Sequence, residues 1–373
     1  LALHAGYESF WRDGLVRKGL FAGLSDMGLP YYVNVKSGNV LSSANPGDGY
    51  KLLTSYDQNG KAITSKGKSD VNRFFTYSAK LGLQYHFAGG HRIYANGAYF
   101  NDAPTFAQSF ISPRTRNSVV PNLETMKTVS ADLNYQFSSN GYNVRVTGFY
   151  TKIMDQTDMM SFYDDSQNSF TNFAMSGIDQ RHMGIELGFK VPLPLQGLSV
   201  EGALSWGEYI YTSTPRMTQT IDNSAEVVAE HALVPFWASH PVYKKSIVDG
   251  KTVYDTDERG DYIVEKWQKH YVPSTPQLAA NLGFNYRTNS YWFFEIDAQY
   301  FENSYLDMNP LYRTDMAVAG GDGISTPVEV EYMAAQEKFD PVFLLNASVG
   351  KSWYIDRKYN FGFSLNLQNI TNN

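Results

Sequence analysis

The sequence predicts an all-β protein of one class, a transmembrane antiparallel β-barrel, and three observations support this prediction. Ten segments alternate apolar and polar residues with period two, which indicates strands that have one apolar and one polar face. The segments pair around short turns, and long polar loops separate the pairs, as in outer-membrane barrels. Aromatic residues make up 15% of the chain and collect at strand ends, where they suit membrane interfaces.

The hairpin between residues 129 and 150 shows the pattern most clearly. Val129, Leu133 and Phe137 share one face of its first strand, and Asp132 and Asn134 share the other. Strands of roughly 9 to 13 residues, repeated many times, are typical of transmembrane barrels. The expected strands, in chain order, are centred on residues 1–7, 81–87, 93–99, 129–137, 142–150, 183–191, 198–206, 278–286, 292–300, 343–349 and 361–367.

Long loops are expected on one side of the barrel only. They cover approximately residues 14–70, 102–124, 154–180, 213–274 and 303–341. By analogy with outer-membrane barrels, the short turns face the periplasm and the long loops face outside. We expect the apolar side chains to face lipid and the polar ones to face the lumen. The outward set comprises Val129, Leu133, Val144, Leu187, Leu282, Ile296 and Leu365.

Composition excludes several other classes. The chain has no cysteine, so it has no disulfide framework and no thiolate metal site. It has no run of 18 apolar residues, which argues against a helical membrane bundle. The net charge of −6 gives no sign of nucleic-acid binding. Eleven strands is an odd number for a bacterial single-chain barrel and would leave open edges in lipid, so we expect a piece of a larger polypeptide.

Several segments resemble the second half of the barrel of TonB-dependent outer-membrane receptors, with features of the Bacteroidota type. They are residues 77–85, 93–97, 103–104, 149–157, 184–188 and 365–372. The resemblance implies an expected 22-stranded barrel plugged by an N-terminal domain, and import energised by TonB. It makes residues 1–373 the C-terminal part of such a barrel, covering strands 11 to 21, with the plug domain and the last strand absent from this chain.

A set of polar strand residues is expected to face the lumen and to contact the plug or a passing substrate. It comprises Asp132, Asn134, Arg145, Glu186, Glu295 and Asp297, together with Gln84, Glu201 and Gln299. The alternative is that a wet lumen needs polar residues at any position. Glu295 and Asp297 lie two apart on one face, where salt bridges or hydrogen bonds to the plug are favoured over acid–base catalysis.

Aromatic residues in the loops are candidates for binding a small-molecule, glycan or peptide ligand by stacking. The candidates are Phe162, Tyr163, Phe170, Phe173, Trp237, Trp267 and Tyr271; Phe236 lies in the loop of the last three, and Tyr305 and Tyr312 lie in a third loop. The alternative is that long loops pack on each other around such residues.

No motif indicates a cofactor or a metal site. Residues 255–261 begin like a calcium-binding loop, but Arg259 and Lys266 occupy positions that need oxygen ligands, which favours a solvated hairpin tip. His231 and His240 have no matching partner for zinc. No nucleophile elbow or phosphate loop is present, so no enzymatic activity is predicted.

The leading hypothesis is an outer-membrane receptor of a Gram-negative bacterium that captures a scarce nutrient and imports it with TonB-derived energy. Its partners would be the lipid bilayer, the plug domain, the TonB system and possible surface lipoproteins. A second hypothesis is a receptor-like barrel that holds surface lipoproteins without transport. A third is a passive porin, which the long loops and large strand number argue against. The substrate is not identified by the sequence.

Overall fold

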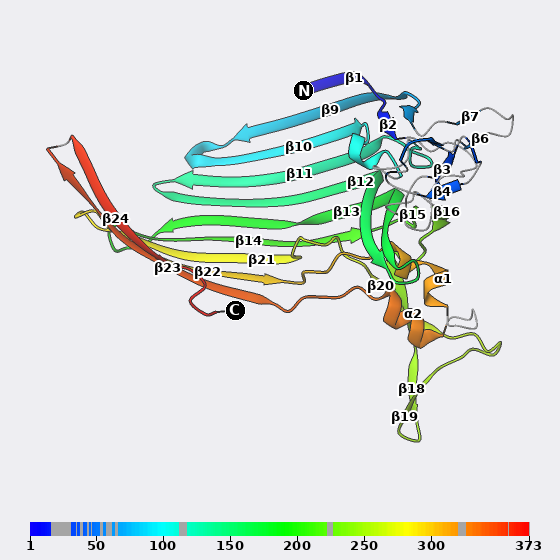
Figure 1. Ribbon diagram of the computed structural model, residues 1–373. Coiled ribbons are helices and arrows are strands. Elements are labelled where there is room, and N and C mark those ends of the chain that lie inside the picture. Colours follow the sequence, from blue (N-terminus) through cyan, green and yellow to red (C-terminus); the bar gives the residue numbers. More distant parts are fainter. Residues whose placement is uncertain are drawn as a thin grey trace.

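The computed structural model describes residues 1–15, 31–34, 36–37, 40–42, 45, 47–52, 55–56, 62–63, 66–111, 118–221, 227–319, 326–356 and 358–372. Within these residues the largest sheet has 13 strands and is antiparallel throughout. Figure 1 shows this sheet as a long, curved wall, with short turns at one end of the strands and a thick layer of connections at the other.

Eleven strands follow one another across this wall, in the order of the chain, and confirm the predicted strands. They are β1 (Ala2–Phe10), β9 (Asn72–His86), β10 (His91–Asp102), β11 (Met126–Ser139), β12 (Tyr142–Asp164), β13 (Ser169–Pro192), β14 (Leu198–Tyr211), β21 (Leu278–Arg287), β22 (Trp292–Glu302), β23 (Val342–Ile355) and β24 (Tyr359–Leu367). Among the described residues β1 and β24 do not pair with each other, so the wall is an open sheet.

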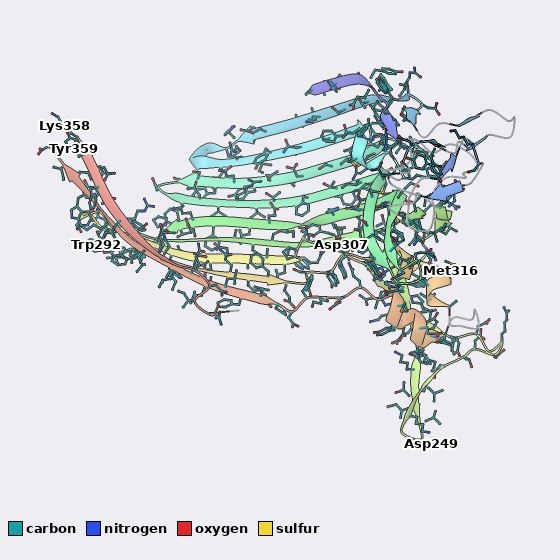
Figure 2. The ribbon with its side chains drawn as sticks, in the orientation of Figure 1. Asp249, Trp292, Asp307, Met316, Lys358 and Tyr359 are labelled. Carbon is teal, nitrogen blue, oxygen red and sulfur yellow. The ribbon has the colours of Figure 1, made fainter. Side chains whose placement is uncertain are left out.

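Tight turns explain the sharp reversals at one end of the wall. Between β11 and β12 the chain turns on Asn140 and Gly141, whose φ angles are 50° and 83°. Two consecutive positive φ angles define the turn that matches the right-handed twist of a hairpin, and Asn-Gly adopts it most readily. Lys358 and Tyr359 mark the turn between β23 and β24, at one extreme of the molecule in Figure 2. One residue of the turn that we expected at 356–360, Arg357, lies outside the described residues.

The two faces of the wall differ in character as expected. One face, called here the apolar face, carries Leu133, Trp206 and Ile296, whose exposed fractions are 60%, 63% and 45%. The opposite face, called the polar face, carries Asn134 and Thr147. Large apolar side chains left exposed along a whole sheet face indicate a non-aqueous neighbour. No helix in the described part of the chain is long and apolar enough to cross a membrane.

The prediction that residues 154–180 form a loop is wrong. β12 and β13 continue through this segment and pair as far as Asp164 and Ser169. Register shifts between Ile153 and Asp158 bend the hairpin where it leaves the wall. The sequence hides this extension because both of its faces are covered: Phe173 and Ala174, which are neighbours, are both buried. A strand buried on both faces does not alternate.

The connections at the far end form a packed body, called here the loop layer, which consists of the described residues of 103–125, 154–180, 212–277 and 303–341. β15 (Arg216–Ile221) pairs with β13 and with β16 (Val227–Leu233), and so extends the main sheet into this layer. The layer also contains β17 (Ser239–Tyr243), β18 (Lys245–Val248), β19 (Lys251–Tyr254), β20 (Val264–Lys269), η2 (Phe106–Gln108), η3 (Pro310–Arg313), α1 (Asp315–Val318) and α2 (Pro327–Ala334).

Hydrophobic burial holds the loop layer together. Its main core joins Phe173 and Met175 of β13 to Met217 of β15 and to Trp237 and Met308 of the connections. α2 starts with a capping box, in which Thr326 and Glu329 exchange hydrogen bonds, and Pro327 is its first residue. Figure 1 shows the β18–β19 hairpin projecting from this layer, with Asp249 labelled at its tip in Figure 2.

Smaller strands lie in the connection between β1 and β9, for which we expected a loop at residues 14–70. They are β2 (Asp13–Leu15), β3 (Tyr31–Asn34), β4 (Val40–Ser42), β5 (Tyr50–Leu52), β6 (Ser55–Tyr56), β7 (Ala62–Ile63) and β8 (Lys66–Lys68); a further short helix, η1 (Ala88–Gly90), forms the β9–β10 turn. The rest of 14–70 lies largely outside the described residues.

Candidate functional site

The polar face carries a hydrogen-bonded network across β10, β11 and β12. The Thr147 hydroxyl donates to the Asn134 side-chain oxygen at 2.6 Å, and the Arg145 guanidinium donates to Thr147 at 3.2 Å. The Asn134 amide donates to Asp132, which also accepts from Asn96 at 2.9 Å. A chain of satisfied polar groups of this kind fixes side-chain positions on a wet surface.

Two cavities lie along the polar face beside this network. One, of about 380 Å³, is lined by Arg145, Glu186, Ser205, Asn281 and Gln299 among others. The second, of about 400 Å³, also reaches Glu186, and aromatic rings of Phe149 and Tyr209 line it. Glu186 lies opposite Thr147 in the β12–β13 register, so both cavities open onto the same face.

Glu295 and Asp297 lie on the polar face of β22 and have partners on neighbouring strands. Ser348 donates to Glu295 at 3.2 Å, and Asn346 donates to Asp297 at 3.0 Å. All nine residues that we expected to face the lumen lie on one face of the sheet, in the expected register. Their contact with a plug or substrate stays a prediction.

The loop aromatics fall into two groups, of which the first is accessible. Tyr163 and Phe170 lie opposite each other near the tip of the β12–β13 hairpin, with exposed fractions of 46% and 58% and rings 5.4 Å apart. Trp267 on β20 is 58% exposed. Tyr271 stacks on Tyr305 with the ring centroids 4.3 Å apart. Burial of Tyr305 and, after it, the interaction with Tyr271 raise the pKa of Tyr305 to about 12.

The second group of aromatics is buried. Phe173 has no exposed surface, Trp237 is 1% exposed, and both belong to the main core of the loop layer. Phe162 is partly buried and packs against that core, with its ring 6.1 Å from that of Phe173. The alternative in which long loops pack around their aromatics therefore describes Phe173 and Trp237, which no ligand reaches while the layer is closed.

A buried histidine pair was missed from the sequence. His240 of β17 and His270, which follows β20, form a 2.7 Å hydrogen bond between His240 Nδ1 and His270 Nε2. The second nitrogen of His270, Nδ1, donates to the Trp237 carbonyl at 3.1 Å, so in the neutral ring Nε2 accepts a hydrogen bond from His240. Thirty residues separate the two histidines, so no local spacing marks them.

Burial controls the protonation of this pair. Burial, followed by the charge of His240, lowers the pKa of His270 to about 3. The pKa of His240 is lowered as well, by burial and then by Arg313. Burial also lowers the pKa of Arg313 to about 10, and this guanidinium donates to the Ala335 carbonyl at 2.7 Å. His231, which we considered with His240 as a weak zinc candidate, has its Nε2 at 3.1 Å from the Asn122 side-chain nitrogen.

In the segment that resembles a calcium-binding loop, residues 255–261, a carboxylate accepts backbone hydrogen bonds within the loop. Asp257 accepts hydrogen bonds from the backbone N–H groups of Arg259 and Asp261 at 2.8 and 2.9 Å. This is a side-chain-capped turn of the kind that Asp commonly forms.

Comparison with known proteins extends these observations. Residues 47–372 match the model of the family described as "TonB dependent receptor-like, beta-barrel". No curated protein matches the chain. Among solved structures, the copper transporter OprC is similar with a TM-score of 0.49 and 12% identity, over 86% of this chain and 39% of that one.

Two further solved structures are similar at the same level. The ferric-catecholate import receptor Fiu from E. coli K12 has a TM-score of 0.45 and 14% identity, over 92% of this chain and 36% of that one. The siderophore receptor PiuA from Acinetobacter baumannii has a TM-score of 0.44 and 14% identity, over 87% of this chain and 35% of that one. The chain thus spans less than half the length of the solved proteins that it resembles.

The family model covers most of the chain, and the sheet has the two-faced wall, the short turns and the long connections of an outer-membrane barrel. Members of this family are outer-membrane receptors and transporters rather than enzymes. The chain belongs to the TonB-dependent receptor β-barrel family.

Proposed function

We propose that this chain forms part of an outer-membrane receptor of a Gram-negative bacterium, of the Bacteroidota type, that captures a scarce nutrient in its loop layer and imports it with TonB-derived energy. The observation that carries the proposal is the two-faced wall: an apolar face for lipid, and a polar face whose cavities are lined by Arg145, Glu186 and Gln299. Such a polar face suits a plug domain and a water-filled path.

The accessible aromatics provide the proposed capture surface. Tyr163, Phe170 and Trp267 offer large ring faces at low entropic cost, and stacking on such faces holds sugars, peptides and chelates. Because Phe173 and Trp237 lie in the core beneath, the capture surface rests on a packed base.

The test is growth on one limiting nutrient at a time, taken from an iron chelate, cobalamin, an oligosaccharide and a peptide. A receptor with Tyr163→Ala, Phe170→Ala and Trp267→Ala should lose uptake of one of these while its surface level is unchanged. The matched control is Tyr332→Ala, since Tyr332 is also an exposed aromatic at 82% but lies on α2. Normal growth of the triple variant on every nutrient that needs the receptor would move the capture surface elsewhere.

A second candidate function is a scaffold for a partner protein such as a surface lipoprotein, and the β18–β19 hairpin favours it. This two-stranded hairpin projects from the loop layer, and Ile247 and Val248 are 80% and 53% exposed. Exposed apolar residues on a strand that has a free edge are suited to a protein partner. Full uptake in a strain that lacks the TonB system, with loss of a co-purifying protein when residues 245–254 are deleted, would favour the scaffold over the importer.

A further inference from the structure

Two cations face each other on the apolar face of the wall, where like charges are unexpected. Lys152 of β12 lies directly opposite Arg181 of β13. Like charges directly opposite each other on neighbouring strands destabilise a sheet. Among the described residues Lys152 forms no ion pair, and Arg181 shares its carboxylate partner: Glu208 binds both Arg181 and Lys269 at 2.5 Å. Two cations therefore share one carboxylate, and a third, Lys152, lies opposite one of them.

The neighbouring charges do not remove this excess. Lys127 of β11 lies beside the site, but its ammonium is 2.6 Å from Asp155 and 3.7 Å from Glu124. That cluster is satisfied by its own carboxylates. The Nε of Arg181 has no hydrogen-bond partner within the described part of the chain, but it is buried, so only the terminal nitrogens of this guanidinium are open to an incoming anion.

An apolar groove begins immediately below these cations. It has a volume of about 880 Å³, and its lining includes the small residues Ala95, Ala131 and Gly148 and the larger Leu133, Tyr150, Met183, Ile185 and Trp206. Glu208, which binds Arg181 and Lys269, also lines it and joins the groove to the cations. A Cβ atom built on Gly148 would meet no atom within 4 Å, so the groove is open at that point.

The strand register places the cations at one end of the groove. Lys152 follows Tyr150 by two residues on β12, and Arg181 precedes Met183 by two on β13, in both cases on the side of the loop layer. Two residues of a strand span about 7 Å. The surface thus changes over a short distance from an apolar channel to a positive cluster.

We propose that this surface is a binding site for a phosphate-bearing acyl lipid of the outer leaflet. The phosphate would be held by Lys152, Arg181 and Lys269, and an acyl chain would lie in the groove over Gly148. Lipid phosphates attract clusters of Lys and Arg at the membrane surface, and an apolar groove that opens sideways from the sheet faces hydrocarbon. The proposal rests on the membrane orientation in the proposed function, but it does not require transport.

The test uses the full-length receptor, purified in detergent from outer membranes and stripped of lipid, with bisphosphorylated lipid A as the probe. Binding is measured by native mass spectrometry. Each cation near a charged membrane surface contributes roughly 1 kcal/mol, so Lys152→Gln should weaken binding about fivefold and Lys152→Gln with Arg181→Gln about 25-fold. Gly148→Leu, which fills the groove and leaves the charges, should also weaken binding.

The control variant is Lys251→Gln, which removes an exposed cation from β19, away from the groove, and should bind lipid A as the unchanged receptor does. Dephosphorylated lipid A should bind weakly to every variant, and inorganic phosphate alone should not displace the lipid. The proposal is overturned if the two cation variants and Gly148→Leu bind lipid A as tightly as the Lys251→Gln control. It is also overturned if removal of the lipid phosphates has no effect on binding, or if inorganic phosphate displaces the lipid completely. Heat-modifiability on gels shows that each variant is folded, and growth assays report separately on import.

Discussion

The buried pair His240 and His270 predicts that the loop layer opens in acid. His270 has no exposed surface, and its pKa lies at about 3 instead of the ordinary 6.5. A pKa that is lower in the folded layer than in the opened one means that the opened layer binds the proton more readily. The stabilisation is therefore fully present above pH 6.5 and is lost as the pH falls toward 3.

The size of this effect follows from the two pKa values. At pH 4.5 an accessible histidine is almost fully protonated, whereas the buried His270 is almost fully neutral. Because the opened layer binds this proton and the folded layer does not, the free energy needed to open the layer is about 3 kcal/mol lower at pH 4.5 than at neutral pH. His240 acts in the same direction, because its pKa is lowered by burial and by Arg313.

Hydrogen exchange measured in the receptor at pH 7.5 and 4.5, and corrected for the intrinsic exchange rate, tests this prediction. The amide of His270 donates to the Ala238 carbonyl at 2.9 Å, so its protection reports opening of the β17–β20 pair. Protection should fall about 100-fold at pH 4.5, which corresponds to about 3 kcal/mol. His270→Gln should reduce this pH dependence, and His231→Gln, whose histidine is half-buried on β16, should keep it. Equal protection at the two pH values would refute the reasoning.

Three further predictions follow from packing and register. Phe173→Ala should destabilise the loop layer by about 3–5 kcal/mol, because the ring is completely buried, and should be detected as faster proteolysis of the layer while the barrel still resists heat. Gly197→Ala should impair assembly, because the added Cβ would lie 1.9 Å from the Arg287 carbonyl oxygen and Gly197 has a φ of +83°. Gly148→Ala should assemble normally, because a Cβ at that position meets no atom within 4 Å; the surface levels of the two variants are compared. Leu187→Arg should cost about 2–4 kcal/mol in a lipid-folding titration and Glu186→Arg far less, because only Leu187 is expected to face lipid; equal costs would contradict that assignment.

The wall could be predicted from the sequence because each strand has one apolar and one polar face. Alternation such as Val129, Leu133 and Phe137 against Asp132 and Asn134 records the environment of both faces, and the Asn140–Gly141 turn fixes the register of the hairpin. All eleven strands and the side of the nine expected lumen residues follow from this pattern, whereas the charged Lys152, Arg181 and Glu208 lie on the apolar face.

The loop layer could not be predicted in the same way. Residues 154–180 lose the alternation because both faces of the extended hairpin are covered by other connections. Nothing local distinguishes the buried Phe173 from the exposed Phe170, three residues earlier. The contact of His240 with His270 and the position of Lys152 opposite Arg181 depend on pairing between strands and appear only when the register is known.

The central claim is that the wall separates lipid from a polar interior, and spin labelling at two adjacent residues of β22 tests it most directly. The 373 residues contain no cysteine, so single cysteines at Ile296 and at Asp297 can be labelled specifically within this part of the receptor. In reconstituted membranes, a nitroxide at 296 should collide mainly with oxygen dissolved in lipid, and one at 297 mainly with a water-soluble nickel complex. The same collision pattern at both positions would contradict the account.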